Sequence, residues 1–241
     1  MYQLSPTTFI VEDLSEIPLP DSIDLLYLDA ETISFDKKRG GLNPYNGDRA
    51  VGWAMTWDDH PFAYYIPIRH RDPEALFQNV FANVEPEDFA KWLNLVLIPG
   101  VTWVNHNVKF DVHVALQDGI RVECRLHDTA TSAKIVDGQS RMRYGLKTLA
   151  EDWLGADNVD QDEVKDELRR MKSKDYGDVS PEVLGHYACM DVHKNRELFG
   201  EIQARRYPGD GTVWDLELDT TKALLEVEQH GVRVDKARLA T

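Results

Sequence analysis

One segment restricts the fold of this chain more than any other: an apolar run that ends in two acids. Residues Leu25–Leu28 are apolar almost without interruption, and Asp29 and Glu31 follow directly. A run that is apolar on both faces predicts a central strand of a sheet. Side chains alternate across a strand, so residues two apart share a face. The sequence therefore predicts two acids that project together where the most buried strand ends.

Further strands are expected before and after this segment. Their sequences are rich in apolar and aromatic residues and are bounded by turn residues. They cover residues 8–11, 50–57, 61–68, 101–104 and 120–124. Three sequential strands with short links predict an antiparallel meander, and the later strands are separated by helices.

Helices are expected where apolar residues recur at steps of three and four. In the segment 86–98, Phe89, Leu93 and Val96 follow this spacing. The other predicted helices cover residues 108–117, 129–135, 146–154, 162–171 and 181–202. A sheet that begins antiparallel, continues through strand–helix–strand links and is followed by helices is an α/β arrangement.

The clearest linker is Tyr207–Gly211, which contains one proline and two glycines. Such a cluster predicts a break between structural units. Beyond it we expect an amphipathic helix over Val213–His230 and the start of a strand over Val232–Val234. The predicted organisation is one domain over residues 1–206 and a linker with the first elements of another module over residues 207–241.

The charge balance limits the partners of this chain. Its 241 residues include 27 Lys and Arg and 42 Asp and Glu, so the formal net charge is −15. A domain this acidic repels polyanions at long range, unless some of its acids bind divalent cations. The 42% of apolar residues exclude a disordered acidic tail. With no membrane span, no secretory signal and only two cysteines, we expect a reduced, intracellular protein.

Two further polar pairs lie on predicted helices. Asn107 and Asp111 are four residues apart, and so are Tyr187 and Asp191. Residues four apart lie on one face of a helix. Taken singly, each pair also fits an ordinary solvated face. Taken together, three segments carry acids in an order that can bring them to one end of an α/β sheet.

These segments resemble the three exonuclease motifs of the DEDD superfamily. They are Leu28–Thr32 (LDAET), Asn105–Asp111 (NHNVKFD) and Tyr187–Asp191 (YACMD). The match is closest to the DnaQ-like proofreading domain of family A DNA polymerases, the DNA polymerase I type. Residues 63–68, 127–129 and 146–154 also follow the order of the family, and residues 224–235 resemble the start of its polymerase module. The resemblance implies a ribonuclease-H-like mixed sheet, an antiparallel meander followed by parallel strands, flanked by helices.

The same resemblance implies a 3′-5′ exonuclease that removes nucleotides from DNA 3′ ends with two divalent ions, Mg²⁺ or Mn²⁺. The residues matching the family's ligands are Asp29, Glu31, Asp111 and Asp191. Asp29, Glu31 and Asp191 would hold the ion that activates water. Asp29 would bridge to a second ion, held by Asp111 partly through water. Tyr187 would orient the attacking water and not take its proton, because the pKa of a phenol is about 10.

Four residues are candidates for substrate binding by resemblance: Asn107, Phe35, Arg143 and Thr32, the last as part of the first motif. Asn107 would hydrogen-bond the terminal sugar or phosphate, and Phe35 would stack on the terminal base or separate the strands. Arg143 matches a family arginine near the scissile phosphate. Two structural alternatives stay open: Phe35 as a loop aromatic packed on the core, and Arg143 as a solvated side chain.

The expected partners are a DNA 3′ end, single-stranded or frayed over three or four nucleotides, and a polymerase module in cis or in trans. Basic residues occur only in small clusters such as Lys37–Arg39. We therefore expect this chain alone to bind DNA weakly and with steep salt dependence. We also expect a monomer in the cytoplasm of a bacterial or phage-infected cell, or in an organelle. DNA synthesis is not expected, because the sequence stops before any palm-like region.

Two questions stay open at the level of sequence. His186 lies five residues before Asp191, so the pattern of the histidine branch of the superfamily also fits, with histidine as a general base. We favour Tyr187 because it shares the helix face of Asp191. An RNA-trimming exonuclease of the ribonuclease D type is the second candidate for the activity. A catalytically weak module that binds DNA or braces a polymerase is the third, although all four acids are present.

Overall fold

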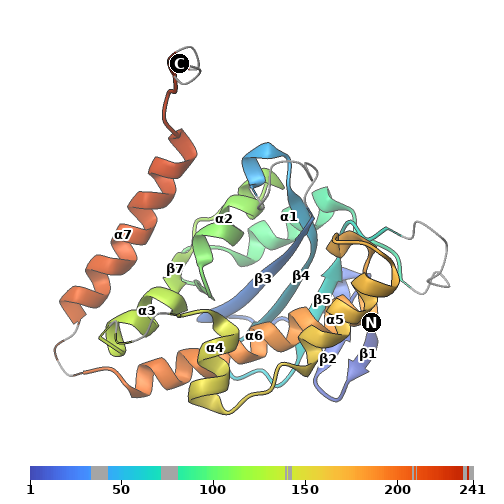
Figure 1. Cartoon of the computed structure of the whole chain (residues 1–241), viewed down its shortest axis with the longest axis horizontal. Helices are drawn as coiled ribbons and strands as arrows, with labels where there is room; N and C mark the ends of the chain where they lie inside the picture. The colour runs from blue at the N-terminus through green and yellow to red at the C-terminus, as the bar shows by residue number, and fades with distance from the viewer. Residues whose placement is uncertain are drawn as a thin grey trace.

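The computed structural model describes residues 1–33, 43–71, 81–138, 140, 143–207, 209, 211–235 and 238. Within these residues, one mixed sheet forms the centre of the molecule and helices cover it (Figure 1). Its strands are β1 (Tyr2–Ser5), β2 (Thr8–Ile10), β3 (Leu25–Ile33), β4 (Arg49–Trp57), β5 (Ala63–Pro67), β6 (Thr102–Asn105) and β7 (Arg125–Asp128). Their spatial order is β1-β2-β5-β4-β3-β6-β7.

The described connections between the strands include α1 (Pro86–Val96), α2 (Val108–Gln117) and the short helical turns η1 (Leu14–Glu16) and η2 (Pro44–Asn46). The helices that follow β7 are α3 (Thr129–Val136), α4 (Leu146–Leu149), α5 (Val159–Arg170), α6 (Pro181–Ala204) and α7 (Gly211–His230), with the turns η3 (Ala150–Leu154) and η4 (Tyr176–Asp178) between them. No helix in the described part of the chain is long and apolar enough to cross a bilayer.

The strand directions follow the predicted scheme. β3, β4 and β5 are neighbours and antiparallel, which is the expected meander. β6 pairs with β3 in parallel, and β7 pairs with β6 in parallel. β2 adds in parallel to the free edge of β5, and β1 pairs antiparallel with β2. The predicted α/β fold with a mixed sheet is confirmed.

The two faces of β3 pack against different helices. Leu26 and Leu28 belong to a core cluster that includes residues of α1 and α2. Tyr27 belongs to a second cluster, formed largely with α6. Because side chains alternate along a strand, Asp29 and Glu31 lie on the same face as Tyr27. The alternation thus directs the two acids toward α6.

Two element predictions are wrong, for different reasons. Residues 120–124 do not form a strand: the N–H of Ile120 donates to the carbonyl of Ala115 at 3.0 Å and closes the end of α2. Pairing with β6 therefore begins only at Arg125. Val232–Val234 is not a strand either, because these exposed residues lie on no sheet edge. The helix predicted over 146–154 is present, and its second half, η3, has π-helical geometry after α4.

Helix α7 lies on the outside of the molecule, with the C-terminus beyond it (Figure 1). Three of its residues are nevertheless buried: Trp214, Thr221 and Leu225. Trp214 packs into a cluster with Leu198 and Ile202 of α6, and Leu225 joins the core on the α2 side of the sheet. Glu228 of α7 also forms an ion pair with Lys109 of α2.

Candidate active site

The structure brings the four predicted acids together from three elements. β3 carries Asp29 and Glu31, α2 carries Asp111, and α6 carries Asp191. Three of them are almost inaccessible, with exposed fractions of 6% for Glu31, 3% for Asp111 and 7% for Asp191. These segments are far apart in the sequence. The prediction of a single site required that they meet in the folded chain.

The register of β3 explains how a helix reaches the two strand acids. β3 pairs with β4 along residues 26–33, whereas it pairs with β6 only along residues 25–27. The edge of β3 beyond Tyr27 is therefore free for the start of α2. Asp111 fills it, because its Oδ1 accepts the N–H of Ala30 at 3.0 Å. The sequence placed Asp29 and Glu31 at the strand end; they lie inside a longer strand whose neighbour has ended.

Burial raises the pKa of all four acids, and repulsion from other acids of the cluster adds to this for Asp29, Glu31 and Asp111. Burial and the charge of Asp191 raise the pKa of Asp29 to about 6. Burial, Asp29 and Asp191 raise the pKa of Glu31 well above its usual range. Burial and Asp29 do the same for Asp111. For Asp191, burial raises the pKa while the charge of Lys147 opposes that rise. The cluster thus carries more negative charge than the surrounding protein neutralises.

The donor set fits a hard divalent cation. Carboxylate oxygens are the ligands that Mg²⁺ and Mn²⁺ prefer. Within the described residues, however, no three His, Cys, Asp or Glu side chains are arranged around one point as a ready-made cage. Protein donors occupy one oxygen each of Asp29, Asp111 and Asp191.

Two of those donors were missed by the sequence interpretation. The Nδ2 of Asn105, at the end of β6, donates to Oδ1 of Asp29 at 3.1 Å. Lys147 of α4 forms an ion pair with Asp191. Both residues lie in segments that match the family, yet neither has a partner at helical or strand spacing that would have marked it.

Tyr187, and not His186, faces the acids. Burial together with the charges of Glu31 and Asp191 raises the pKa of the Tyr187 phenol far above its usual value, so it stays protonated. Its ring meets that of Tyr176 edge-on, with centroids 6.5 Å apart. His186 instead lies toward β2, where its Nδ1 is 3.3 Å from Oγ1 of Thr8. One step along α6 is enough to turn the histidine away from the site.

The residues predicted to bind substrate differ in their exposure and in the elements that carry them. Asn107 is the N-cap of α2, four residues before Asp111, with a left-handed backbone (φ 63°) and an exposed side chain. Its own N–H donates to Asp128 at 3.1 Å, which fixes this turn. Arg143 is exposed just before α4, and Thr32 is buried in β3 opposite Ala50. Phe35 lies outside the described residues.

Comparison with known proteins gives a consistent result along most of the chain. A family described as 3′-5′ exonuclease matches residues 19–205. DNA polymerase I of Borreliella burgdorferi is 23% identical over 99% of this chain and 26% of its own length. DNA polymerase DpoZ of Salmonella phage PMBT28 is 26% identical over 85% of this chain and 31% of its own length. The chain thus spans about a quarter to a third of these relatives.

Solved structures show the same fold at low identity. NrnC of Brucella melitensis bound to pGG superposes with a TM-score of 0.58 at 22% identity, over 92% of this chain and 89% of NrnC. RNase D of Escherichia coli gives a TM-score of 0.54 at 15% identity, over 88% of this chain and 46% of RNase D. A further structure of the Brucella protein contains bound Mg²⁺. These likenesses confirm the predicted ribonuclease-H-like fold.

Proposed function

Since the chain belongs to the 3′-5′ exonuclease family of the DNA polymerase A type, we propose that it hydrolyses the terminal phosphodiester of a DNA strand at its 3′ end and releases nucleoside 5′-monophosphates. The observation that carries this proposal is the cluster of four acids with raised pKa, delivered by β3, α2 and α6. Such a cluster suits divalent ions that stabilise the negative charge of a reacting phosphodiester.

For the ligand roles we propose those that the resemblance to the exonuclease family implies. Asp29, Glu31 and Asp191 would hold one ion, and Asp111 a second one that Asp29 shares. Bound there, the ions would supply a water nucleophile at neutral pH and neutralise charge on the leaving oxygen. The Tyr187 hydroxyl, protonated throughout, orients the attacking water. The exposed side chains of Asn107 and Arg143 would bind the terminal sugar and its phosphate.

Tyr187→Phe is expected to slow cleavage about ten- to hundredfold at saturating metal, because one orienting hydrogen bond is lost. His186→Ala should change the rate less than about threefold, since His186 contacts Thr8 and not the acids. The measurement is single-turnover cleavage of a 5′-labelled single strand. If His186→Ala abolishes cleavage while Tyr187→Phe leaves it intact, the assignment of Tyr187 is wrong.

DNA is proposed as the substrate because the curated relatives are DNA polymerases. The ribonuclease D type remains the competing candidate, since RNase D shares the fold. Cleavage of a DNA strand is expected to be on the order of 10- to 100-fold faster than cleavage of an RNA strand of matched sequence, the range that a pocket achieves against an added hydroxyl. Faster cleavage of RNA would favour the ribonuclease D type of activity.

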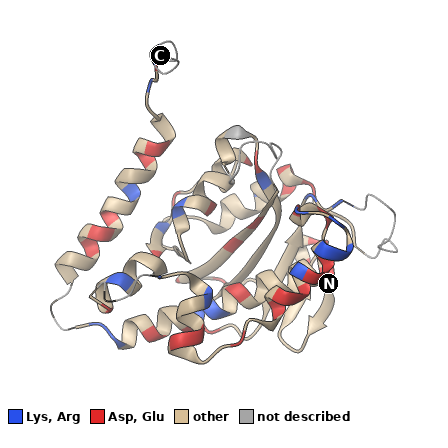
Figure 2. Ribbon diagram, in the orientation of Figure 1, with Lys and Arg blue, Asp and Glu red and all other residues tan. Residues whose placement is uncertain are grey.

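The charge distribution makes weak DNA binding part of the proposal. Acidic residues lie on β3 and along α5, α6 and α7, and basic residues are interspersed with them (Figure 2). Several of those bases are paired locally, for example Lys165 with Asp162 and Arg169 with Asp166. We propose that a polymerase module, in cis or in trans, supplies most of the affinity for DNA. Nanomolar binding of single strands by this chain at physiological salt would contradict that.

A further inference from the structure

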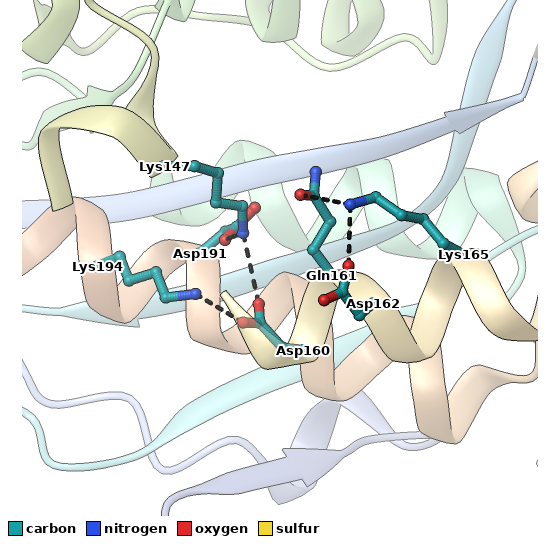
Figure 3. Close-up of polar contacts among 7 residues, drawn as sticks. All are labelled: Lys147, Asp160, Gln161, Asp162, Lys165, Asp191 and Lys194. Carbon is teal, nitrogen blue, oxygen red and sulfur yellow. Dashed lines mark hydrogen bonds and ion pairs between the residues drawn. The ribbon is translucent and has the colours of Figure 1, made fainter. Parts of the chain in front are cut away.

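A lysine lies inside the acid cluster that is proposed to bind metal. Lys147 projects from α4 toward α6, and its Nζ forms an ion pair with Asp191 (Figure 3). The same Nζ is 4.3 Å from the centroid of the Tyr187 ring, which is a favourable cation–π distance. Only 21% of the Lys147 side chain is exposed. One ammonium group therefore contacts both a proposed metal ligand and the proposed water-orienting tyrosine.

Lys147 also has a second anionic partner outside the ligand set. Its Nζ is 3.4 Å from Oδ2 of Asp160, at the start of α5 (Figure 3). The other oxygen of Asp160 accepts from the buried Lys194 at 2.8 Å. Burial acts to raise the pKa of Asp160, but the two lysines hold it below its usual value, so Asp160 stays ionised. Lys147 thus lies between two carboxylates, of which only one is a proposed ligand.

An ammonium group and a divalent ion cannot both stay close to one carboxylate without strong repulsion. Asp191 must turn its oxygens to the ion if it is to act as a ligand. Lys147 needs another anion when that happens, because leaving its charge in a mostly buried site without a partner is costly. Asp160 already lies within reach and is not needed as a ligand.

We propose that Lys147 is an internal cation that competes with divalent ions for Asp191 and shifts to Asp160 when an ion binds. This inference rests on the proposed function, since it concerns the same acids. Lys147 is a positioning residue in this scheme: it holds Asp191 in place in the metal-free protein and weakens the affinity for the ion. Asp160 is the anion that receives it.

The test is direct measurement of Mn²⁺ binding by isothermal titration calorimetry, without DNA. Lys147→Gln is expected to bind Mn²⁺ about tenfold more tightly than the unmodified protein, because the competing charge is gone. Lys147→Arg keeps that charge and should stay within about twofold. The matched control is Lys165→Gln, which makes the same charge change on a lysine that contacts Gln161 and Asp162 instead (Figure 3). Unchanged or weaker binding by Lys147→Gln overturns the proposal.

The role of Asp160 is tested with a double-mutant cycle. Asp160→Asn should weaken Mn²⁺ binding about threefold or more, because Lys147 then stays on Asp191. In the Lys147→Gln background the same substitution should have no effect. A full effect in both backgrounds would show that Asp160 acts on the ion through its charge alone, and the proposed shift would be wrong. Should Asp160→Asn fail to fold, a crystal structure with Mn²⁺ decides: Lys147 on Asp160 supports the shift, and Lys147 on Asp191 overturns it.

These measurements distinguish a failure of the inference about Lys147 from a failure of the proposed metal-dependent function. If the unmodified protein binds Mn²⁺ and Lys147→Gln binds it no better, the inference about Lys147 fails while the proposed nuclease site stands. If neither protein binds Mn²⁺ at millimolar concentration, the metal-dependent function fails as well. If only Lys147→Gln binds Mn²⁺, the competition is supported in its strongest form.

Discussion

Asp29→Asn is expected to reduce the rate of 3′-end hydrolysis by on the order of 10³-fold at saturating Mg²⁺ or Mn²⁺. Metal ions contribute several kcal/mol of transition-state stabilisation, and each ~1.4 kcal/mol is a factor of ten in rate. Asp29 is the acid proposed to contact both ions. It also interacts with the charges of Asp191 and Glu31, the two acids proposed to share the first ion with it.

The control for this prediction is Asp162→Asn on α5. That carboxylate is exposed and pairs with Lys165 on the surface, so the same chemical change there should leave the rate within about twofold. Single-turnover rates and far-UV circular dichroism of both variants provide the comparison. An Asp29→Asn protein that is folded and keeps a tenth or more of the activity would remove Asp29 from the proposed site.

The same substitution is expected to stabilise the protein when metal is absent, and increasingly so as the pH rises. The pKa of Asp29 is about 6 in the folded chain against an ordinary value of 3.8. The folded state therefore binds more protons than the unfolded state between these values, and the free energy of unfolding falls as the pH rises through this window. Replacing Asp29 by Asn removes this loss, which amounts to about 3 kcal/mol at pH 7 for two units of pKa.

The measurement is urea unfolding of both proteins in EDTA from pH 4 to pH 7. The stability difference should be near zero at pH 4 and favour Asp29→Asn at pH 7. Comparing the two proteins also cancels the opposite trend from His70, His127 and His193, whose pKa burial lowers to about 4 in both. When EDTA is replaced by Mn²⁺, the free energy of unfolding should rise for the unmodified protein and not for the variant. A variant that is less stable than the unmodified protein at pH 7 in EDTA would show that burial of the Asp29 charge and its repulsion by Asp191 do not destabilise the folded chain.

The pairs of candidate residues were predictable because they depend on local geometry. Residues 29 and 31 share a strand face, and residues 187 and 191 share a helix face, whatever surrounds them. The apolar run before Asp29 likewise predicted a central strand, since such a run is stable only when both faces are buried. The error at residues 120–124 has the opposite origin. Ile120 follows the end of α2 and packs into the core. A short apolar segment that covers a helix end has the same local sequence pattern as a short strand.

The choice between Tyr187 and His186 required the packing of α6. The two residues are neighbours in sequence, and both spacings to Asp191 fit a known pattern. The packing of α6 against the sheet places His186 beside Thr8 of β2 and Tyr187 beside Glu31 and Asp191.

By itself, the sequence determined which residues share a face, which strand is central and which family the motifs resemble. The tertiary structure alone decided that the acids meet, that Asn105 and Lys147 lie among them, and that Asp160 is close enough to share a lysine with Asp191. The physical reason is the range of the interactions. Periodicity is set by backbone geometry within one element, whereas the meeting of charges from β3, α2, α4, α5 and α6 depends on how the whole core packs.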